Sequence, residues 1–202
     1  MSTPATHCDR FVRLNSRTGA VAIDRDALPN AAASVLFGPG VALAAFPAEV
    51  KRISEGRPIM LVAGASSSRT PAIAQAVAAL AEVASPACTY MVEGISDATV
   101  IARGIQLAAD YDVGTVAIIG GGTTIDVGKA IAALVRQAGA LPASADAVLS
   151  FTAGELKINP AAALSWCAMP TTTGTGSEST WNSVLEEGDV KLSLKGVPPA
   201  SL

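Results

Sequence analysis

Three consecutive glycines at residues 120–122 have neighbours that suit the binding of an anion. They follow an apolar, β-branched run at residues 115–119, typical of a strand covered on both faces of a parallel sheet. After them, Ile125, Ile131 and Leu134 recur at helical spacing, which places the glycines at a helix N-terminus. Free N–H groups and the positive end of the helix dipole meet there, and glycine lets another group approach the backbone closely. The pattern therefore predicts a site for an anion such as a pyrophosphate.

A second segment, residues 170–180, is also rich in glycine and hydroxyl groups and follows a short strand expected at residues 165–169. Taken alone, this composition is typical of a polar surface turn. In a parallel sheet, however, the segments that follow successive strands meet at one edge. Both glycine-rich segments could therefore reach the same edge.

The elements that must position these segments alternate along the chain. Strands are expected at residues 58–63, 87–92, 115–119 and 165–169, and helices at 41–53, 71–83, from about 97, and from 124. Residues 139–163 resemble a long loop with at most a short helix, and hairpins are expected within residues 9–23 and 181–194. The order predicts an α/β fold with a doubly wound, mainly parallel sheet, helices on both faces (Rossmann-like) and a C-terminal β-hairpin.

Neither standard nucleotide fingerprint fits the triple-glycine turn. A P-loop needs four residues between its glycine and Gly-Lys, whereas Gly122 and Gly128 enclose five, and Ala130 replaces the magnesium-binding hydroxyl. The G-x-G-x-x-G pattern fails because Ile125 stands at the third glycine. A tight strand-to-helix connection that binds nothing is therefore an alternative explanation of the glycines.

Composition narrows the class of protein. The 202 residues carry a net charge of −3 without a basic cluster, which argues against nucleic acid as a partner. No apolar run approaches the roughly 20 residues of a membrane span and residues 1–20 lack a signal-peptide core, so we expect no membrane association and a cytoplasmic protein. Three scattered cysteines and the single His7 favour neither a disulfide framework nor a metal site within the chain.

The two glycine-rich segments together carry a family resemblance. The first, Gly120-Gly-Gly-Thr-Thr-Ile-Asp-Val-Gly-Lys129, resembles the Gly-Gly-Gly-Ser-x-x-Asp-x-Ala-Lys motif of the iron-containing (group III) alcohol dehydrogenases. The second, Pro170-Thr-Thr-Thr-Gly-Thr-Gly-Ser-Glu178, resembles their Pro-Thr-Thr-x-Gly-Thr-Gly-Ser-Glu motif. The resemblance covers nearly the whole chain and implies that residues 1–202 form the N-terminal dinucleotide-binding domain of a dehydroquinate synthase-like superfold.

The resemblance also implies site residues. It assigns Gly121, Gly122 and Thr123 to the cofactor pyrophosphate and Asp126 to the nicotinamide side, although Asp126 suits a first-turn carboxylate that complements the helix dipole equally well. Family positions that line the adenosine and nicotinamide-ribose pocket match Thr171, Thr172, Thr175 and Thr180, and a ribose-contacting lysine falls near Lys191. Lys129 could be structural, and no catalytic residue is assigned.

One departure from the family pattern concerns the choice of cofactor. Many NAD-preferring members carry an aspartate after the second strand, where it binds the adenosine ribose and would repel a 2′-phosphate. Residues 64–69 of this chain contain no carboxylate and end in Arg69. We therefore expect NAD or NADP as the cofactor, with NADP slightly favoured.

A second departure concerns the metal. The family's metal ligands, an aspartate and three histidines, belong to a helical C-terminal domain that this sequence lacks, so Fe2+ or Zn2+ is expected only in a full-length enzyme. The chain is expected to be the NAD(P)-binding portion of an enzyme that moves hydride between a small alcohol or aldehyde and nicotinamide, inactive alone and homo-oligomeric. A non-catalytic binding or assembly module and a sugar-phosphate cyclase of the same superfold are the alternatives.

Overall fold

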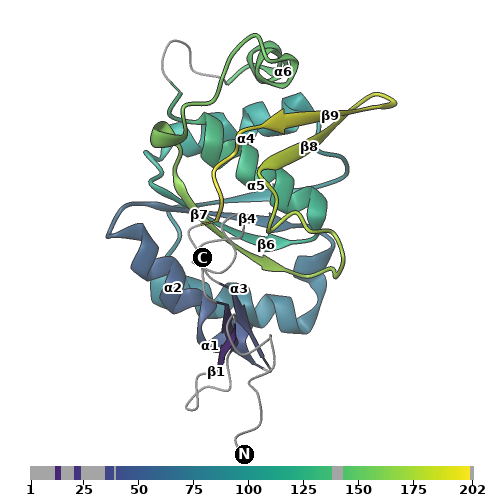
Figure 1. Ribbon diagram of the computed structural model, residues 1–202. Helices are drawn as coiled ribbons and strands as arrows, with labels where there is room; N and C mark the ends of the chain where they lie inside the picture. Colours follow the sequence, from purple (N-terminus) through teal and green to yellow (C-terminus); the bar gives the residue numbers. More distant parts are fainter. Residues whose placement is uncertain (1–11, 15–20, 24–34, 39, 138–142, 201–202) are drawn as a thin grey trace, which may run out of the picture.

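The computed structural model describes residues 12–14, 21–23, 35–38, 40–137 and 143–200. Its centre is a parallel four-stranded sheet (Figure 1). The strands run in the order β5 (Cys88–Val92), β4 (Ile59–Gly64), β6 (Thr115–Gly120) and β7 (Ser165–Pro170). The register pairs Gly120 with Pro170, so the ends of β6 and β7 lie side by side. The expected strands and their parallel arrangement are confirmed.

The two central strands are apolar because both of their faces are covered. Every residue of β4 and β6 is buried. Along β6, Val116 and Ile118 belong to one hydrophobic core, whereas Ala117 and Ile119 belong to another on the opposite face. This alternation of side chains along a strand explains why one uninterrupted apolar run serves two cores.

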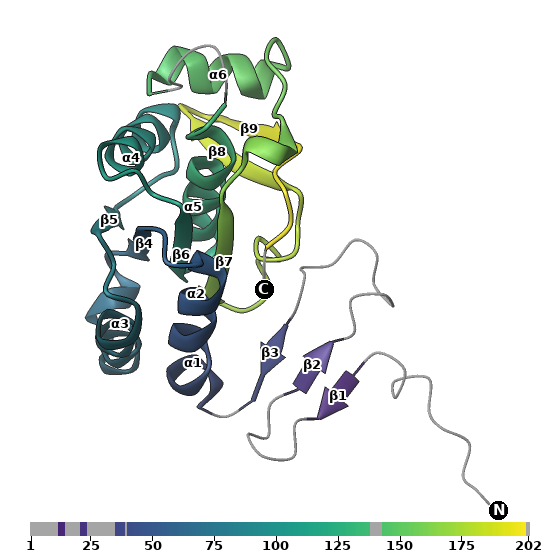
Figure 2. The same cartoon turned by 90° about the vertical axis from the view of Figure 1, so that its left-hand side faces the viewer.

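Helices cover both faces of the sheet (Figure 2). Helices α2 (Phe46–Ser54) and α3 (Pro71–Ala84) pack on one face, and α4 (Ala98–Asp110) and α5 (Gly122–Leu134) on the other. Helix α5 lies close to the sheet, since a Cβ added at Gly128 would lie 2.6 Å from Ile118 Cγ1. The doubly wound, Rossmann-like fold is therefore confirmed.

The C-terminal hairpin packs on the same side of the sheet as α5. Strands β8 (Asn182–Glu187) and β9 (Val190–Lys195) pair antiparallel, and Leu185 and Leu194 are buried in the core that includes α5. The amide of Glu186 donates to the Ser96 carbonyl at 3.0 Å, which ties the hairpin to the segment before α4. The expected hairpin is confirmed, and its base lies directly after the second glycine-rich segment.

The prediction of one helix over residues 41–53 was wrong. The chain forms α1 (Val41–Ala44), turns at Ala45, and begins α2 at Phe46. Pro47 lies in the first turn of α2, where its missing N–H would have had no partner inside the helix. Proline is therefore accommodated by starting a second helix rather than by interrupting one.

Helix α3 has the expected bounds within a residue, and Ile73 and Val77 pack, partly buried, against the core on one face of the sheet. Leu80 and Ala76 are buried, whereas Val83 is 41% exposed. Thr70 occupies the N-cap position, but its hydroxyl donates to the Ser67 carbonyl at 2.8 Å instead of capping the helix.

The remaining elements lie at the periphery. A small antiparallel sheet is formed by β1 (Val12–Leu14), β2 (Val21–Ile23) and β3 (Leu36–Phe37). The pairing of β1 with β2 agrees with the expected N-terminal hairpin, although residues 9–11 and 15–20 of that prediction lie outside the described residues. The described part of residues 139–163, a stretch expected to be largely loop, contains the nine-residue helix α6 (Ala145–Ala153) and a short 3-10 turn, η4 (Pro160–Ala162). A second 3-10 turn, η3 (Ser67–Arg69), follows β4.

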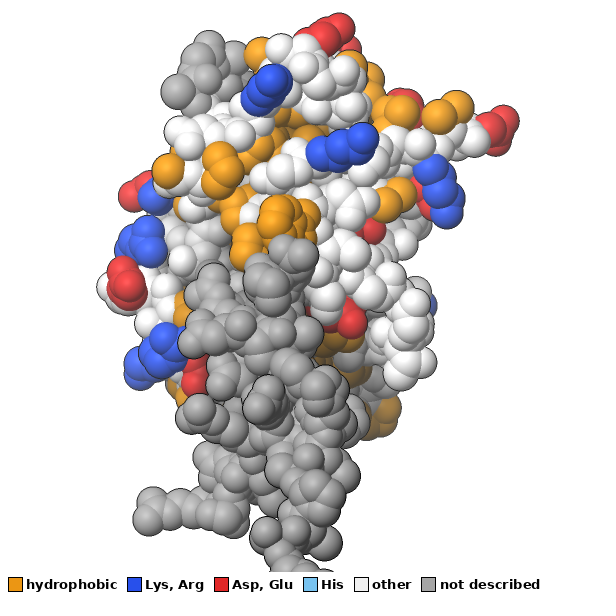
Figure 3. Space-filling view, viewed as in Figure 1, with side chains coloured by type: hydrophobic (Ala, Val, Ile, Leu, Met, Phe, Trp, Pro, Cys, Tyr) orange, Lys and Arg blue, Asp and Glu red, His pale blue; other side chains and the backbone are white. Residues whose placement is uncertain are grey.

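The surface shows no concentration of positive charge on the face drawn in Figure 3, where Lys and Arg side chains are scattered among acidic and uncharged ones. None of the helices in the described part of the chain is both long enough and apolar enough to cross a membrane.

Candidate functional site

The turn after β6 is built entirely by the backbone. Helix α5 begins at Gly122, with Gly121 as its N-cap, and the first helical bond runs from the Ile125 amide to the Gly121 carbonyl at 3.0 Å. A Cβ added at Gly120 would lie 2.5 Å from Thr124 Cβ, so no larger residue fits between the strand and the helix. Because the first N–H groups of a helix have no partner inside it, this turn presents backbone donors and the positive end of the helix dipole.

The second glycine-rich segment, residues 171–180, lies directly against this turn. We call it the hydroxyl loop. The amide of Thr171 donates to the Gly120 carbonyl at 2.9 Å. A Cβ added at Gly121 would lie 3.0 Å from Thr172 Oγ1, and one added at Gly122 would lie 3.1 Å from Thr175 Cβ. The two segments therefore share one edge of the sheet, as the parallel topology predicts.

The hydroxyl loop itself has no regular secondary structure. Gly174 and Gly176 adopt positive φ angles of 82° and 69°, which only glycine takes up without strain. The Ser179 amide donates to the Gly176 carbonyl at 2.9 Å, and Ser177 is the buried residue of the segment. The residues Thr172 and Thr175 are exposed, and the Thr175 hydroxyl donates to Glu178 Oε2 at 3.4 Å and accepts from the Ser177 amide at 3.4 Å.

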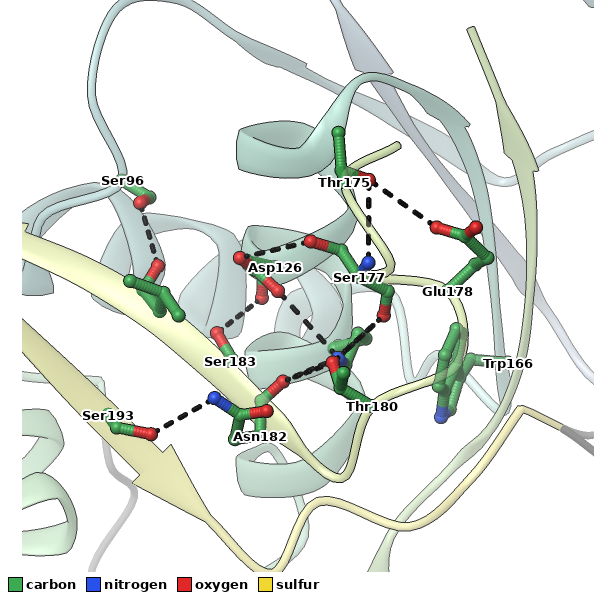
Figure 4. Close-up of polar contacts among 12 residues, drawn as sticks. Ser96, Asp126, Trp166, Thr175, Ser177, Glu178, Thr180, Asn182, Ser183 and Ser193 are labelled. Carbon is green, nitrogen blue, oxygen red and sulfur yellow. Dashed lines mark hydrogen bonds and ion pairs between the residues drawn. The ribbon is translucent and has the colours of Figure 1, made fainter. Parts of the chain in front are cut away.

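Lys129 is fully buried and connects helix α5 to the loop; its partners Ser177, Thr180 and Asn182 are labelled in Figure 4. Lys129 Nζ donates to the Ser177 carbonyl at 2.7 Å, to Thr180 Oγ1 at 3.1 Å and to the Asn182 carbonyl. The same ammonium group lies 5.9 Å from the centre of the Trp166 ring on β7. Lys129 thus contacts the end of the loop, the base of the hairpin and the sheet.

Asp126 lies one turn before Lys129 on the same helix face. Its Oδ1 is 3.7 Å from Lys129 Nζ, and its Oδ2 accepts a hydrogen bond of 3.4 Å from Ser177 Oγ. Among the described residues, no hydrogen-bond donor reaches Asp126 Oδ1, although this atom is buried. The Ser183 hydroxyl donates to the Asp126 backbone carbonyl at 2.8 Å and fixes the hairpin to the helix.

Burial opposes both charges of this pair. It raises the pKa of Asp126 above the usual range of an aspartate, and the nearby Lys129 ammonium counteracts part of that increase. It lowers the pKa of Lys129, and the Asp126 carboxylate counteracts part of that decrease. Each group therefore depends on the other to remain charged.

The nine predicted site residues do not all gather at one place. Eight of them lie on the turn, on the first two turns of α5 or in the hydroxyl loop: Gly121, Gly122, Thr123, Asp126, Thr171, Thr172, Thr175 and Thr180. Lys191 lies on β9, and its exposed ammonium is 3.4 Å from Glu186 across the hairpin. The Thr180 hydroxyl is engaged by Lys129 rather than directed away from the protein.

A cavity of about 600 Å³ borders the other side of the hydroxyl loop. Its polar wall includes residues 171–174 and Glu178, and its apolar wall includes Val35, Val41 and Phe46. Because Thr172 lines this cavity and also lies nearest to Gly121, the cavity adjoins the edge where the turn and the loop meet. Its volume is in the range of small-molecule sites.

The residues present fit a dinucleotide but do not form a metal site. Three features suit a dinucleotide. The start of α5 offers backbone donors, and Gly121 and Gly122 carry no Cβ where the turn meets the hydroxyl loop. The third feature is the buried Asp126 Oδ1, which has no hydrogen-bond donor among the residues described. In contrast, no group of three or more His, Cys, Asp or Glu side chains within the described ranges could hold a metal ion. His7 lies outside those ranges.

Comparison with known families decides the relationship. The model of the family described as iron-containing alcohol dehydrogenase matches residues 32–199. The chain belongs to this family. The resemblance carried by the two glycine-rich segments is therefore confirmed. Curated protein sequences gave no match.

Solved structures of this family share the fold. NADH-dependent butanol dehydrogenase A from Thermotoga maritima has 22% identity and a TM-score of 0.65, over 81% of this chain and 40% of that protein. Sulfoacetaldehyde reductase from Bifidobacterium kashiwanohense, in complex with NAD+, has 22% identity and a TM-score of 0.64, over 81% and 42%. An alcohol dehydrogenase from Oenococcus oeni has 26% identity and a TM-score of 0.61, over 78% and 40%. This chain thus spans about two fifths of the length of these dehydrogenases.

Three residues that join α5 to the loop and hairpin, Ser177, Asn182 and Ser183, were not identified from the sequence. Their contacts with α5 use the carbonyl groups of Ser177 and Asn182 and the hydroxyl group of Ser183, which leave no distinctive pattern in a sequence. The spacing of Asp126 and Lys129 was a usable signal, because side chains three residues apart lie on one helix face.

Proposed function

We propose that this chain binds NAD(H) or NADP(H), with the pyrophosphate held at the edge where the start of α5 meets the hydroxyl loop. The observation that carries the proposal is the approach of Gly121 and Gly122 to Thr172 and Thr175, which brings helix N–H groups and hydroxyl groups to one edge. Backbone amides at a helix start are a common site for a phosphate. Gly121, Gly122 and Thr123 would face the pyrophosphate, and the adjoining cavity would have room for one nucleoside.

The remaining site residues would position the rest of the cofactor. Thr171, Thr172 and Thr175 carry hydroxyl groups suited to ribose, and we keep Asp126 on the nicotinamide side, which requires its buried Oδ1 to exchange Lys129 for the cofactor. We keep Lys191 as a ribose contact, which requires its ammonium to exchange Glu186 for the cofactor.

In an alcohol dehydrogenase, the nicotinamide supplies the hydride chemistry, and the protein supplies binding, orientation and the exclusion of competing reactions. We assign binding and orientation to the described residues, and no step to a metal. The complete enzyme would act on a small alcohol or aldehyde, and this chain alone would have no turnover. Two observations support this assignment: the family match, and an NAD+ complex of a similar fold in sulfoacetaldehyde reductase.

Calorimetric titration of the 202-residue chain with NADH, NADPH and ADP-ribose tests the proposal. We expect saturable one-to-one binding of all three, because they share the pyrophosphate. Circular dichroism establishes that the chain is folded under the same conditions. A folded chain that takes up none of the three at millimolar concentration would overturn the proposal. Self-association without dinucleotide binding would favour the assembly module instead.

We further propose that the chain accepts the 2′-phosphate of NADPH. The segment after β4 contains no carboxylate, and Arg69 lies on it with an exposed guanidinium near Ser66 Oγ at 3.5 Å. This segment is close to the turn, since a Cβ added at Gly64 would lie 2.8 Å from Thr124 Oγ1. An arginine here would attract the additional phosphate.

The Arg69→Ala variant tests this preference. We expect it to raise the Kd for NADPH by roughly fivefold to tenfold, the effect of losing one partly screened charge contact, and to change that for NADH by less than about twofold. Arg103→Ala, on the distant helix α4, is the matched control. An equal effect of Arg69→Ala on both cofactors would remove the basis for the NADPH assignment.

We also propose that the complete enzyme is a homo-oligomer. Light scattering measures the mass of the protein in solution, and a monomer at all accessible concentrations would contradict this.

A further inference from the structure

We propose that Lys129 is a positioning residue for the cofactor: its buried ammonium fixes the hydroxyl loop against helix α5, and so sets the relative position of the two segments that would contact the pyrophosphate. This inference rests on the dinucleotide-binding function proposed above. Lys129 itself would not touch the cofactor, because its side chain is fully buried beneath the loop.

The donors of the lysine and the acceptors around it match in number. An ammonium group has three N–H donors, and Nζ is within hydrogen-bonding distance of the Ser177 carbonyl, Thr180 Oγ1 and the Asn182 carbonyl. Two of the three acceptors are backbone atoms, so the contacts fix the path of the chain rather than the rotamer of a side chain. A buried cation with all donors satisfied is a strong local constraint because charge-assisted hydrogen bonds exceed neutral ones in strength.

The loop needs such a constraint. It lacks helix and strand pairing, it contains Gly174 and Gly176 at positive φ, and most of it is exposed. Its first residue is held by the bond from the Thr171 amide to Gly120, so one end is fixed by the sheet. Lys129 fixes the other end, at residues 177–182. The residues between these two anchors are those that face Gly121 and Gly122.

Two acidic groups near Lys129 favour the protonated form of its side chain. Asp126 on the same helix and Glu178 on the loop both favour the protonated ammonium, whereas burial opposes it, and the net effect is a lowered pKa. Trp166, which packs against the ammonium from β7, carries no ionisable group. As pH rises through the lowered pKa of Lys129, the ammonium loses a proton and one of its three hydrogen bonds. The loop is then expected to loosen.

The Lys129→Met variant, which replaces the unbranched apolar stem of the side chain but removes its donors, tests the inference. Lys157→Met, on an exposed surface segment, is the matched control. In Lys129→Met we expect amide hydrogen exchange at residues 173–180 to accelerate at least about tenfold, while exchange in β4 and β6 stays unchanged, and the Kd for NADH to rise by a similar factor. The wild-type Kd is expected to rise between pH 7 and 10, and the variant is expected to lose that dependence.

Thr180→Val is a second variant, which removes one acceptor without leaving a carbonyl or a charge unpaired. It should accelerate loop exchange by roughly twofold to fivefold, whether or not Lys129→Met folds. Unchanged loop exchange in the folded variants would overturn the positioning role. If the wild-type chain binds no NADH, the dinucleotide function fails, yet the exchange measurement still decides whether Lys129 holds the loop.

Discussion

The two segments that meet at the candidate site are constructed in opposite ways. The turn at residues 120–122 continues a buried strand into a buried helix, and close packing against Thr124 determines its conformation. The hydroxyl loop is mostly exposed, and a buried lysine and a few side-chain contacts determine its conformation. One half of the site is therefore fixed by exclusion of volume, and the other half by hydrogen bonds.

This difference suggests that the turn contributes mainly to the stability of the fold and the hydroxyl loop mainly to binding. Errors of packing in the turn should propagate into the core, since β6 and α5 belong to it. Changes on the loop side should leave the core intact and alter the relative position of the two segments. The two regions should therefore respond differently to the same chemical change.

Gly120→Ala should give the largest effect. The added Cβ would lie 2.5 to 2.7 Å from three atoms of Thr124, and the nearest of them, Thr124 Cβ, cannot move without shifting the first turn of α5. We expect the free energy of unfolding to fall by about 2 kcal/mol, as for other overpacked core positions. Urea denaturation monitored by circular dichroism measures this quantity, and an unchanged midpoint would show that the turn is not fixed by packing.

Gly122→Ala makes the same change two residues later, where the loop can yield. The nearest atoms are 3.1 to 3.3 Å away and belong to Thr175 and Ser177. The unfolding free energy should change by less than about 1 kcal/mol, because alanine also favours a helix. The Kd for NADH should nevertheless rise about tenfold, since the methyl group would push Thr175 and Ser177 away from the turn and displace the loop from the position proposed for binding.

Gly154→Ala, at a helix end remote from the site, controls for Gly122→Ala and should leave NADH binding unchanged. If Gly122→Ala instead lost as much stability as Gly120→Ala and bound NADH normally, the proposed contrast between the two segments would be wrong.

The smallest effect concerns the pKa of Asp126, which pairs with Lys129 where α5 meets the hydroxyl loop. Removing the ammonium in Lys129→Met should raise the pKa of Asp126 further, because Lys129 is the main influence that opposes the effect of burial. The sign follows from charge: without a neighbouring cation, a buried carboxylate is harder to ionise. Carbon NMR of the Asp126 carboxyl group measures the pKa, and a pKa that stays constant or falls would show that the two groups are not coupled.

Much of the fold could be predicted because it depends on local patterns. The apolar run of β6 and the glycines after it define a strand, a turn and a helix within about 20 residues, and the same periodicity locates β4 and β7. The break at Ala45 was missed because both halves of the stretch have helical composition. Pro47 was the available signal, and it marked the start of a helix rather than its interior.

The candidate site was less predictable because its contacts join distant parts of the chain. The motif containing Lys129 was recognised, but no local pattern shows that its side chain reaches Ser177 and Asn182. The role of Lys191 depends on how the hairpin approaches the cofactor, and its contact in the structure is with Glu186. Such contacts follow from the tertiary packing of α5 against the hairpin.

The most direct measurement of the central claim is amide hydrogen exchange of the chain with and without saturating NADH. If the pyrophosphate lies on the edge that the two segments share, the cofactor should protect residues 121–124 and residues 171–180 together, while exchange in α6 stays unchanged. Protection of only one segment, or binding of NADH without protection of either, would contradict the shared site.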